Sequence, residues 1–262
     1  MPPNEPDRQA VAIGRAALRA PLLLGGQAAR AGLSCASCHK NGRGNPDFSF
    51  PGLSGEPGTA DVTSSIMSSH RGDGTHNPKP IPDLADPPRL AAHDRESRAL
   101  ERFLRGLIVE EFDGREPTPA VLNGLAEYVR AIDPEACRGK GAEPIRLETM
   151  LSDGRAAMAA AVRALEGRDR PTALFLVGAA RSQLGRVDER FRLPGLEPSR
   201  ELLRRSDVKL RAIEAAIRRG APDASRQMQD WQRRWPELKR RLQRQEERSF
   251  FSRRVLRRYL RS

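Results

Sequence analysis

The chain has 262 residues, enough for one or two domains that each have a core of their own. An aromatic content of 5% makes any core mainly aliphatic, three cysteines are too few for a disulfide-stabilised scaffold, and no apolar run is long enough for a transmembrane helix. The net charge of +12 is uneven: residues 1–145 carry 17 basic and 19 acidic side chains, whereas residues 146–262 carry 29 and 15. All cysteines and histidines lie in the first part, so we predict two domains, at 9–136 and 145–262, with a linker around 134–144.

The first domain is predicted to contain short helices and a long loop. The apolar pattern over residues 10–32 indicates a helix that is interrupted at Pro21. Residues 41–90 contain eight prolines and seven glycines, a density that excludes regular secondary structure. Helices are expected again over 95–108 and from Pro119 to about Ile132, with Thr118 as the N-cap. A bound cofactor with an apolar surface would explain how so long a loop is held in a compact domain.

Four helical segments are predicted in the second domain, at 145–166, 171–191, 198–219 and 223–260. Each has an apolar seam at helical spacing, and glycines and prolines mark the turns between them. Short connections favour antiparallel neighbours, so we expect an antiparallel four-helix bundle. Pro236 lies inside the last segment and is expected to kink or restart it. The fold class of the whole chain is therefore predicted to be all-α.

The strongest chemical signal is the pentapeptide Cys35-Ala36-Ser37-Cys38-His39, which has the pattern C-x-x-C-H. Two thiols at this spacing can add across the two vinyl groups of one haem, and the adjacent histidine is then held beneath the iron as an axial ligand. Covalent attachment needs no deep pre-formed pocket, which suits a domain of short helices and long loops. We therefore expect one covalent haem c, attached to Cys35 and Cys38 and ligated by His39.

Two other interpretations of the cysteine pair stay open. A redox-active C-x-x-C would need a βαβ context, which the predicted helices do not provide. Half of a zinc site would need a second pair of ligands, and the candidates His70, His76, His93 and Cys137 are not at zinc-finger spacing. A zinc-stapled interaction protein without a redox role is thus an alternative function.

Five segments of the first domain carry a family resemblance: G-R-A-A-L at 14–18, L-S-C-A-S-C-H at 33–39, N-G-R at 41–43, P-I-P-D-L at 80–84 and L-A-E-Y-V-R-A-I at 125–132. Together they resemble the haem-binding domain of the dihaem cytochrome c peroxidase family. The resemblance covers about residues 10–133 and implies a cytochrome c-like fold, a covalent haem c, and electron transfer or peroxide reduction outside the cytoplasm. That family carries two haems, whereas this chain has one C-x-x-C-H. Its distal-methionine segment has at most a degenerate counterpart here, at 111–114.

The sixth ligand of the iron is left open by the sequence. Met67, His70 and His76 all follow the motif after a loop of about thirty residues. A methionine there gives a high-potential electron carrier, a histidine gives a lower potential, and an empty position admits peroxide or a gas. We expect Met67 first and His70 second, against the simpler interpretation that Met67 only fills the core. An empty position would favour a peroxidase-like haem enzyme, the other alternative function.

Four further features accompany the motif. Arg71 and Lys79 are candidates to pair with haem propionates, although solvated charges are the more frequent outcome. The acidic residues at 110–113 are expected to mark a charged helix end rather than a general acid–base group. His93 is expected to be exposed. Cys137 has no intrachain partner once the motif is used, and is predicted to be a free thiol or an intermolecular link.

The second domain has no histidine, cysteine or glycine-rich phosphate loop, so we predict no catalytic site in it. Its last segment holds nine arginines between Arg240 and Arg261, which are either a solvated face or a docking surface. Haem c proteins mature outside the cytoplasm, so the expected partners are an acidic redox protein or an anionic membrane surface, and not nucleic acid.

The expected location is periplasmic or extracytoplasmic. Residues 1–5 lack the charged start and apolar core of a signal peptide. We therefore expect that a targeting segment has been trimmed or lies upstream of this start. The function predicted from the sequence is electron transfer in the periplasm by a c-type cytochrome with one covalent haem.

Overall fold

The computed structural model describes residues 7–63, 67, 69–70, 72–86, 98–133, 135 and 145–261. Most of these residues are helical, in agreement with the predicted all-α class. The chain divides into two compact units, Met1–Lys140 (unit 1) and Gly141–Ser262 (unit 2), and the boundary falls inside the predicted linker. None of the helices in the described ranges combines the length and the apolar character that crossing a bilayer requires.

Unit 1 begins with a helix that stops before Pro21, as the sequence predicts. α1 (Arg8–Leu18) starts where the Asp7 carboxylate accepts a hydrogen bond from the Gln9 N–H at 2.8 Å. Pro21 lacks an N–H and cannot continue the helix, so the chain forms a 3-10 turn at Pro21–Leu23. Two short helices follow, α2 (Gly26–Arg30) and α3 (Cys35–Cys38). Both cysteines of the motif therefore lie on the four-residue helix α3, which follows the 3-10 turn and α2.

α1 packs against α6 (Pro119–Arg130) through a pair of glycines. A β-carbon on Gly14 would lie 1.9 Å from the carbonyl oxygen of Gly124, and one on Gly124 would lie 2.9 Å from the Gly14 nitrogen. The two backbones approach this closely only because both residues lack a side chain. α6 starts as predicted: the Thr118 hydroxyl accepts from the Val121 N–H at 3.3 Å, and a proline occupies the first turn.

The helix predicted at 95–108 extends further than expected. α5 (Ala99–Gly106) continues into a π-helical turn at Leu107–Glu111, and residues 95–97 lie outside the described residues. Leu100 of α5 is buried against Ala126 and Val129 of α6. The amphipathic face thus packs on α6, in keeping with the apolar periodicity.

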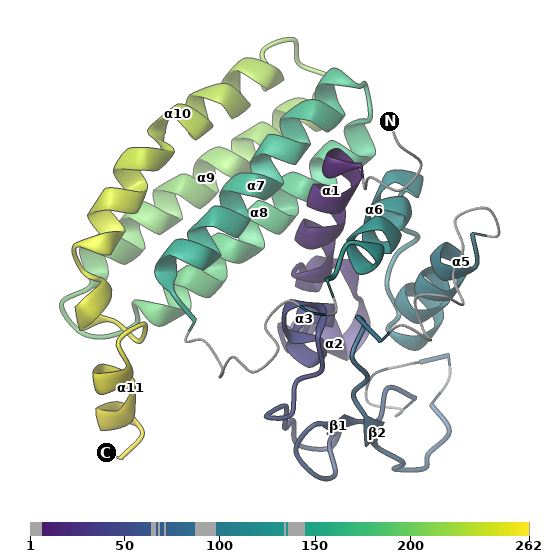
Figure 1. Cartoon of the computed structure of the whole chain (residues 1–262). Helices are drawn as coiled ribbons and strands as arrows, with labels where there is room; N and C mark the ends of the chain where they lie inside the picture. The colour runs from purple at the N-terminus through teal and green to yellow at the C-terminus, as the bar shows by residue number, and fades with distance from the viewer. Residues whose placement is uncertain are drawn as a thin grey trace. The chain divides into compact units, whose positions relative to one another are not determined.

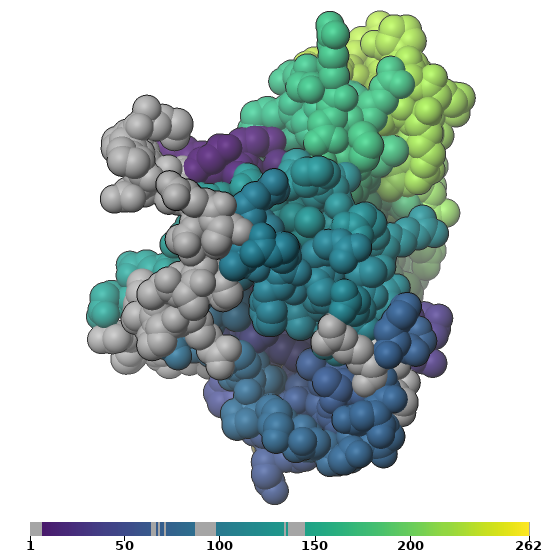
Figure 2. Space-filling view, turned by 90° about the vertical axis from the view of Figure 1, so that its right-hand side faces the viewer, coloured from purple at the N-terminus to yellow at the C-terminus, as the bar shows by residue number. Residues whose placement is uncertain are grey.

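The described residues between 41 and 86 are mainly irregular, as their proline and glycine content predicts. No sequence signal predicted the short antiparallel ladder between β1 (Thr59–Ala60) and β2 (Lys79–Pro80). Elsewhere side chains replace ladders. The Asp61 carboxylate accepts from the Asn77 N–H at 2.8 Å and from the Thr63 N–H and hydroxyl. On one face of unit 1 this loop, in blue, lies beside α5 and α6, in teal (Figure 2).

Unit 2 is a four-helix bundle of α7 (Leu147–Glu166), α8 (Arg170–Arg190), α9 (Glu197–Arg219) and α10 (Ala224–Gln243). Each helix packs against the next, and α10 returns to α7 and closes the bundle (Figure 1). Short connections make sequential neighbours antiparallel, as predicted. The core is aliphatic, and its fully buried side chains include Leu147, Leu151, Met158, Leu176, Leu203, Leu210 and Ile217.

The last predicted segment is two helices rather than one. α10 runs through Pro236, so of the kink or restart expected at this proline, the restart does not occur. The bundle contacts of Trp235 and Leu242, both buried, outweigh the single backbone hydrogen bond that Pro236 removes. The break comes after Gln243, where a 3-10 turn at Glu246–Arg248 leads to α11 (Arg253–Tyr259).

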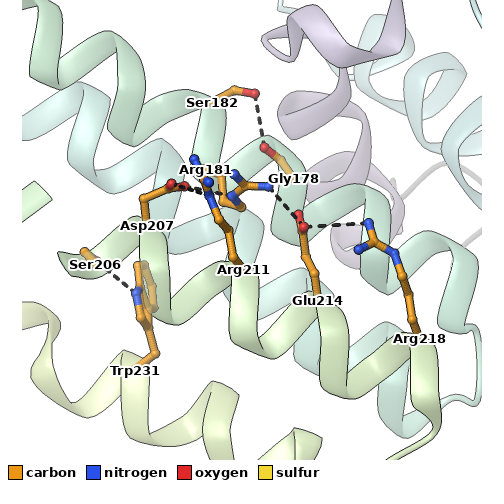
Figure 3. A network of polar contacts seen from close by, with 9 residues as sticks. All are labelled: Gly178, Arg181, Ser182, Ser206, Asp207, Arg211, Glu214, Arg218 and Trp231. Carbon is orange, nitrogen blue, oxygen red and sulfur yellow. Dashed lines mark hydrogen bonds and ion pairs between the residues drawn. The ribbon is translucent and has the colours of Figure 1, made fainter. Parts of the chain in front are cut away.

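A polar network joins α8 to α9 inside unit 2. The Arg181 guanidinium on α8 donates to the Asp207 carboxylate at 2.7 Å and to the Glu214 carboxylate at 3.0 Å, both on α9 (Figure 3). Because Glu214 is buried, this ion pair is shielded from water much better than a surface pair. Further contacts join Asp207 to Arg211, Glu214 to Arg218, and the Trp231 indole N–H on α10 to the Ser206 hydroxyl.

Candidate cofactor site

The cysteine motif forms a single helical turn. At its N-terminus the Ser34 N–H donates to the Ser37 hydroxyl at 3.0 Å. The spacing of three residues places Cys35 and Cys38 on the same side of α3. His39 follows directly, and its N–H donates to the Cys35 carbonyl at 2.8 Å. Local helix geometry therefore gathers the two thiols and the imidazole into one compact unit.

Both cysteines border a single apolar cluster in unit 1. Residues from α2, from the loop 41–86 and from the end of the π-helical turn converge on it, so the segments around the motif share one core. Cys35 and Cys38 are thus partly buried against apolar side chains. Its buried members are Leu24, Ala28, Phe48, Leu53, Ala60 and Met67, with Leu33, Phe50, Ile81 and Phe112 partly buried against them.

Burial disfavours the thiolate form of both cysteines. Neither Cys35 nor Cys38 forms a disulfide in the structure. Desolvation raises the pKa of Cys35 to about 11, and desolvation together with the neighbouring Cys35 raises that of Cys38 to about 12. Redox-active C-x-x-C pairs and zinc thiolates depend on the opposite shift, toward a low pKa. Cys35 and Cys38 have the opposite shift and remain thiols at neutral pH.

The imidazole of His39 is oriented by a backbone carbonyl. Nδ1 of His39 lies 3.1 Å from the carbonyl oxygen of Pro82. Because a carbonyl only accepts, Nδ1 carries the proton, and Nε2 is then the nitrogen with a lone pair for a metal. A hydrogen bond from the second ring nitrogen is the usual way in which proteins fix a ligating histidine.

Three contacts hold the segment 80–85 against the motif. Besides the bond to His39, the Leu84 N–H donates to the Gly42 carbonyl at 3.1 Å, and the Arg43 guanidinium pairs with Asp83 at 2.7 Å. Gly42 has a φ of +79°, and a β-carbon there would lie 2.3 Å from Ile132. We name this arrangement the clasp: residues 39–43 joined to residues 80–85. The clasp fixes the orientation of His39 through contacts far apart in the sequence.

The two leading candidates for the sixth ligand lie in different places. Met67 is 1% exposed and belongs to the apolar cluster that Cys35 and Cys38 border. The His70 side chain is 61% exposed, and its Nδ1 lies 2.9 Å from the Asp113 carboxylate. The geometry thus brings Met67 together with the cysteines and holds His70 at the surface.

Asp113 anchors the end of this loop. Its carboxylate accepts from the Ser69 N–H and hydroxyl as well as from His70. Desolvation alone would raise the pKa of Asp113, but the hydrogen bonds from His70 and Ser69 outweigh it and lower that pKa. The acidic group predicted at 110–113 therefore serves in part to hold the loop that carries Met67.

The remaining predicted residues are less informative. His76 and Lys79 are exposed on the loop 41–86. Arg71, His93 and Cys137 lie outside the described residues, so the structure does not bear on the roles predicted for them.

Within the described ranges, no three His, Cys, Asp or Glu side chains gather into a metal-binding group. A structural zinc site needs four such ligands, whereas a haem iron takes one or two from the protein. With His70 and His76 both exposed, the zinc interpretation gains no support from the arrangement of these residues.

Sequence reasoning missed two contributors to the site. Pro82 acts through its carbonyl oxygen, a group that every residue has, so no sequence signal marks it. Asp113 has a φ of +52°, an uncommon conformation that aspartate tolerates better than most residues. The following Gly114 is an indirect signal of a turn there, but nothing in the sequence pairs Asp113 with Ser69.

Comparisons of the chain with protein-family models, with curated proteins and with solved structures find no match.

Proposed function

We propose that unit 1 is a c-type cytochrome domain that binds one haem covalently through Cys35 and Cys38, with His39 as an axial ligand, and transfers electrons outside the cytoplasm. One observation carries the proposal: two reduced thiols on one helical turn border a single apolar cluster, and the next residue is a histidine oriented by a carbonyl. The motif C-x-x-C-H supplies the chemistry, and the fold supplies the surroundings that this chemistry needs.

Cys35 and Cys38 would form the covalent attachment. In each addition the sulfur bonds to one vinyl carbon and the thiol hydrogen goes to the other, so no oxidant or reductant is consumed. The raised pKa values keep both groups as thiols at neutral pH. Their separation by one helical turn places them to reach two substituents of the same ring.

His39 and Met67 would supply the axial ligands. The bond to Pro82 holds the His39 ring and strengthens its Nε2 as a donor. Burial of Met67 in the same apolar cluster favours a thioether as the second ligand. When bound, the haem supplies reversible one-electron chemistry, and a histidine–methionine pair favours a high reduction potential. Two protein ligands leave no position for peroxide, so electron transfer is preferred over the peroxidase-like alternative.

Two features of unit 1 support a cytochrome c-like fold for it. Its first and last described helices, α1 and α6, cross at Gly14 and Gly124. The loop 41–86 folds over the cluster beside the motif. Covalent attachment would give this long loop the apolar surface that its few backbone ladders do not provide.

The decisive test is haem attachment. The full chain is fused to a cleavable secretion signal and co-expressed with haem c maturation factors, and denatured protein is assayed by the pyridine haemochrome spectrum. We expect one haem per chain that resists acid–acetone extraction. Cys35→Ala together with Cys38→Ala should abolish attachment, and Cys137→Ala, which removes the third cysteine, should retain it. Haem-free wild-type chain, or chain purified with stoichiometric zinc, would overturn the proposal.

The sixth ligand is tested separately by Met67→Leu. Leucine nearly conserves the volume of methionine, so the core should lose less than about 1.5 kcal/mol. The ferric wild type should show a low-spin spectrum with the red charge-transfer band of methionine ligation, and Met67→Leu should lose that band. His70→Ala is the control and should keep it. A high-spin ferric wild type would instead support the peroxidase-like alternative.

A further inference from the structure

The C-terminal helix of unit 2 is packed less closely than the four helices of the bundle. α11 (Arg253–Tyr259) contains no buried residue. It projects beyond the end of the bundle formed by α7–α10 (Figure 1). Val255 and Leu256 are partly buried, whereas Tyr259 is 58% exposed and Leu260 is 75% exposed. Leu260 thus lies in water beside a strongly basic segment, and Tyr259 is more than half exposed although its ring contacts Phe250.

The arginines of α11 are not neutralised within the described part of the chain. Residues 253–261 contain five arginines and no acidic residue. Across the described ranges, no ion pair or side-chain hydrogen bond joins any of the five to another residue. These five, which we call the α11 arginines, are Arg253, Arg254, Arg257, Arg258 and Arg261.

Several arginines of the bundle pair with acids, whereas others, among them Arg219, Arg234 and Arg240, have no side-chain partner among the described residues. Arg205 pairs with Glu201, Arg226 with Asp223, and Arg181 with both Asp207 and Glu214. Three acids, Glu148, Glu246 and Glu247, line a pocket together with Arg253 and Arg254, and the first two are engaged elsewhere. Glu246 accepts from the Leu147 N–H at 3.2 Å, and Glu148 pairs with Lys239 at 2.6 Å. The α11 arginines therefore form a dense basic segment without an ion pair among the described residues.

The base of α11 is fixed to the bundle. The Phe250 N–H donates to the Arg190 carbonyl at 2.9 Å, and the ring of Phe251 packs on Phe191 with centroids 5.9 Å apart. The Phe250 ring also contacts Tyr259 at 4.9 Å between centroids. The helix is thus presented in a defined position, with its charged and apolar groups together at the surface.

We propose that α11 docks unit 2 on an anionic phospholipid surface. The α11 arginines would contact lipid phosphates, and Tyr259 and Leu260 would enter the interface between headgroups and acyl chains. Exposed aromatic and leucine side chains beside arginines favour a lipid surface over an acidic protein, because lipid offers both anionic and apolar contacts at one depth. This inference does not depend on haem binding by unit 1.

The test measures co-sedimentation of the full chain with vesicles. We expect binding to phosphatidylcholine vesicles that contain phosphatidylglycerol, and little binding to phosphatidylcholine alone. Each arginine near an anionic surface contributes a factor of roughly five in affinity. Replacing Arg253, Arg254, Arg257 and Arg258 by Gln should therefore weaken binding on the order of a hundredfold or more, and added salt should weaken the wild type.

A matched control removes the same charge elsewhere. Arg204, Arg205, Arg226 and Arg233 are exposed and pair with acids on their own helices. Their replacement by Gln should reduce vesicle binding far less than the α11 variant does. Leu260→Asn, which alters no packed residue, should weaken binding a few-fold without changing the salt dependence. Circular dichroism confirms that each variant is folded.

Three outcomes would overturn the proposal. The first is equal binding to anionic and neutral vesicles. The second is an equal loss of binding in the α11 variant and the control variant, which would show a general charge effect. The third is binding of poly-glutamate without binding of vesicles, which would assign α11 to an acidic protein partner.

Discussion

Units 1 and 2 are both helical, but they are stabilised in different ways. Unit 2 consists of helices of 20 to 23 residues whose apolar seams meet along their full length. In unit 1 the helices α2, α3 and α5 have 5, 4 and 8 residues, too short to be stable without tertiary contacts. Its structure depends on a backbone crossing at two glycines, on the clasp, and on a loop that surrounds one apolar cluster.

The difference shows where chemistry can be accommodated. A regular bundle satisfies its own backbone and core, and its residues have little freedom to serve another group. The irregular loop of unit 1 places side chains from distant parts of the sequence around Cys35, Cys38 and His39. Sites on loops that a rigid frame positions are common in functional proteins. The predictions below test whether the two units differ in the way that this comparison implies.

The crossing of α1 and α6 should be the most sensitive point of unit 1. Gly14→Ala would place a β-carbon 1.9 Å from the Gly124 carbonyl oxygen, so the helices must separate. We expect a loss of about 3 kcal/mol, at the upper end of the usual cost of overpacking. Both tryptophans lie in unit 2, so tryptophan fluorescence follows unit 2 alone while circular dichroism follows both units. In Gly14→Ala, the part of the circular dichroism transition that belongs to unit 1 should occur at a lower denaturant concentration. The midpoint of the fluorescence transition should stay unchanged.

In the bundle, a glycine-to-alanine substitution is expected to stabilise rather than destabilise, and Gly185→Ala tests this. Nothing lies within 4 Å of a β-carbon at Gly185, which is in the middle of α8. Alanine should stabilise unit 2 by up to about 1 kcal/mol because its helix propensity exceeds that of glycine. If Gly14→Ala left unit 1 as stable as before, the glycine crossing would not be a determinant of its fold.

The polar network of unit 2 should give the next largest effect. Arg181→Met leaves Glu214, which is buried, and Asp207 without their shared partner on α8. Loss of one partner of a well-buried pair costs 3–5 kcal/mol, and partial exposure of Arg181 reduces this to about 2 kcal/mol. The midpoint of the fluorescence transition, which reports on unit 2, should move to a lower denaturant concentration. Arg211→Gln, which removes an exposed pair on the same acid, should cost less than about 0.5 kcal/mol. Equal losses in the two variants would contradict the burial argument.

The bundle could be predicted from the sequence almost completely. Helix–helix packing leaves an apolar repeat of 3.6 residues, and the turns are marked by glycine and proline. The exception is Pro236, where local propensity suggested a break and the packing of Trp235 and Leu242 kept the helix intact. The actual break after Gln243 carries no such mark, because Ser249 stabilises the turn through its hydroxyl bond to the Glu246 carbonyl.

Unit 1 was predicted only in its local features. The motif, the interruption at Pro21 and the cap at Thr118 each depend on residues close together in the sequence. The clasp joins His39 to Pro82, 43 residues away, through a backbone carbonyl that no side chain reveals. The tie between Ser69 and Asp113 spans 44 residues. Such contacts depend on how the loop folds over the cluster, and the apolar periodicity of the sequence does not predict that folding.

Acid should affect the loop of unit 1 through Asp61. Desolvation would raise the pKa of Asp61, but hydrogen bonds from Asn77 and Thr63 outweigh it and lower that pKa. A carboxylate with a depressed pKa in the folded state stabilises above its unfolded pKa of about 3.9, and this stability is lost as the pH falls through the lower folded value. The free energy of unfolding of unit 1, measured by circular dichroism, should therefore fall below about pH 4.

Asp61→Asn isolates this contribution. The amide keeps an acceptor oxygen but loses the charge, so the variant should cost about 1 kcal/mol at neutral pH. Its stability should then change less than that of the wild type between about pH 5 and pH 2. An identical acid response in the two proteins would show that other carboxylates hold the loop.

The smallest expected effect comes from the ion pair of the clasp. Arg43 and Asp83 are partly exposed, so Arg43→Gln should cost about 0.5–1 kcal/mol of the stability of unit 1. Arg105 and Glu116 form a comparable exposed pair at 2.7 Å, but they are only 11 residues apart, whereas Arg43 and Asp83 are 40 apart. Closing the longer loop removes more conformational freedom. Loss of the Arg43–Asp83 pair should therefore loosen more of the structure than loss of the Arg105–Glu116 pair. Hydrogen exchange of the Leu84 amide, which bonds to Gly42 inside the clasp, reports this directly. Exchange there should accelerate in Arg43→Gln and stay unchanged in Arg105→Gln. The same acceleration in both variants would mean that the clasp is no tighter than an ordinary surface contact.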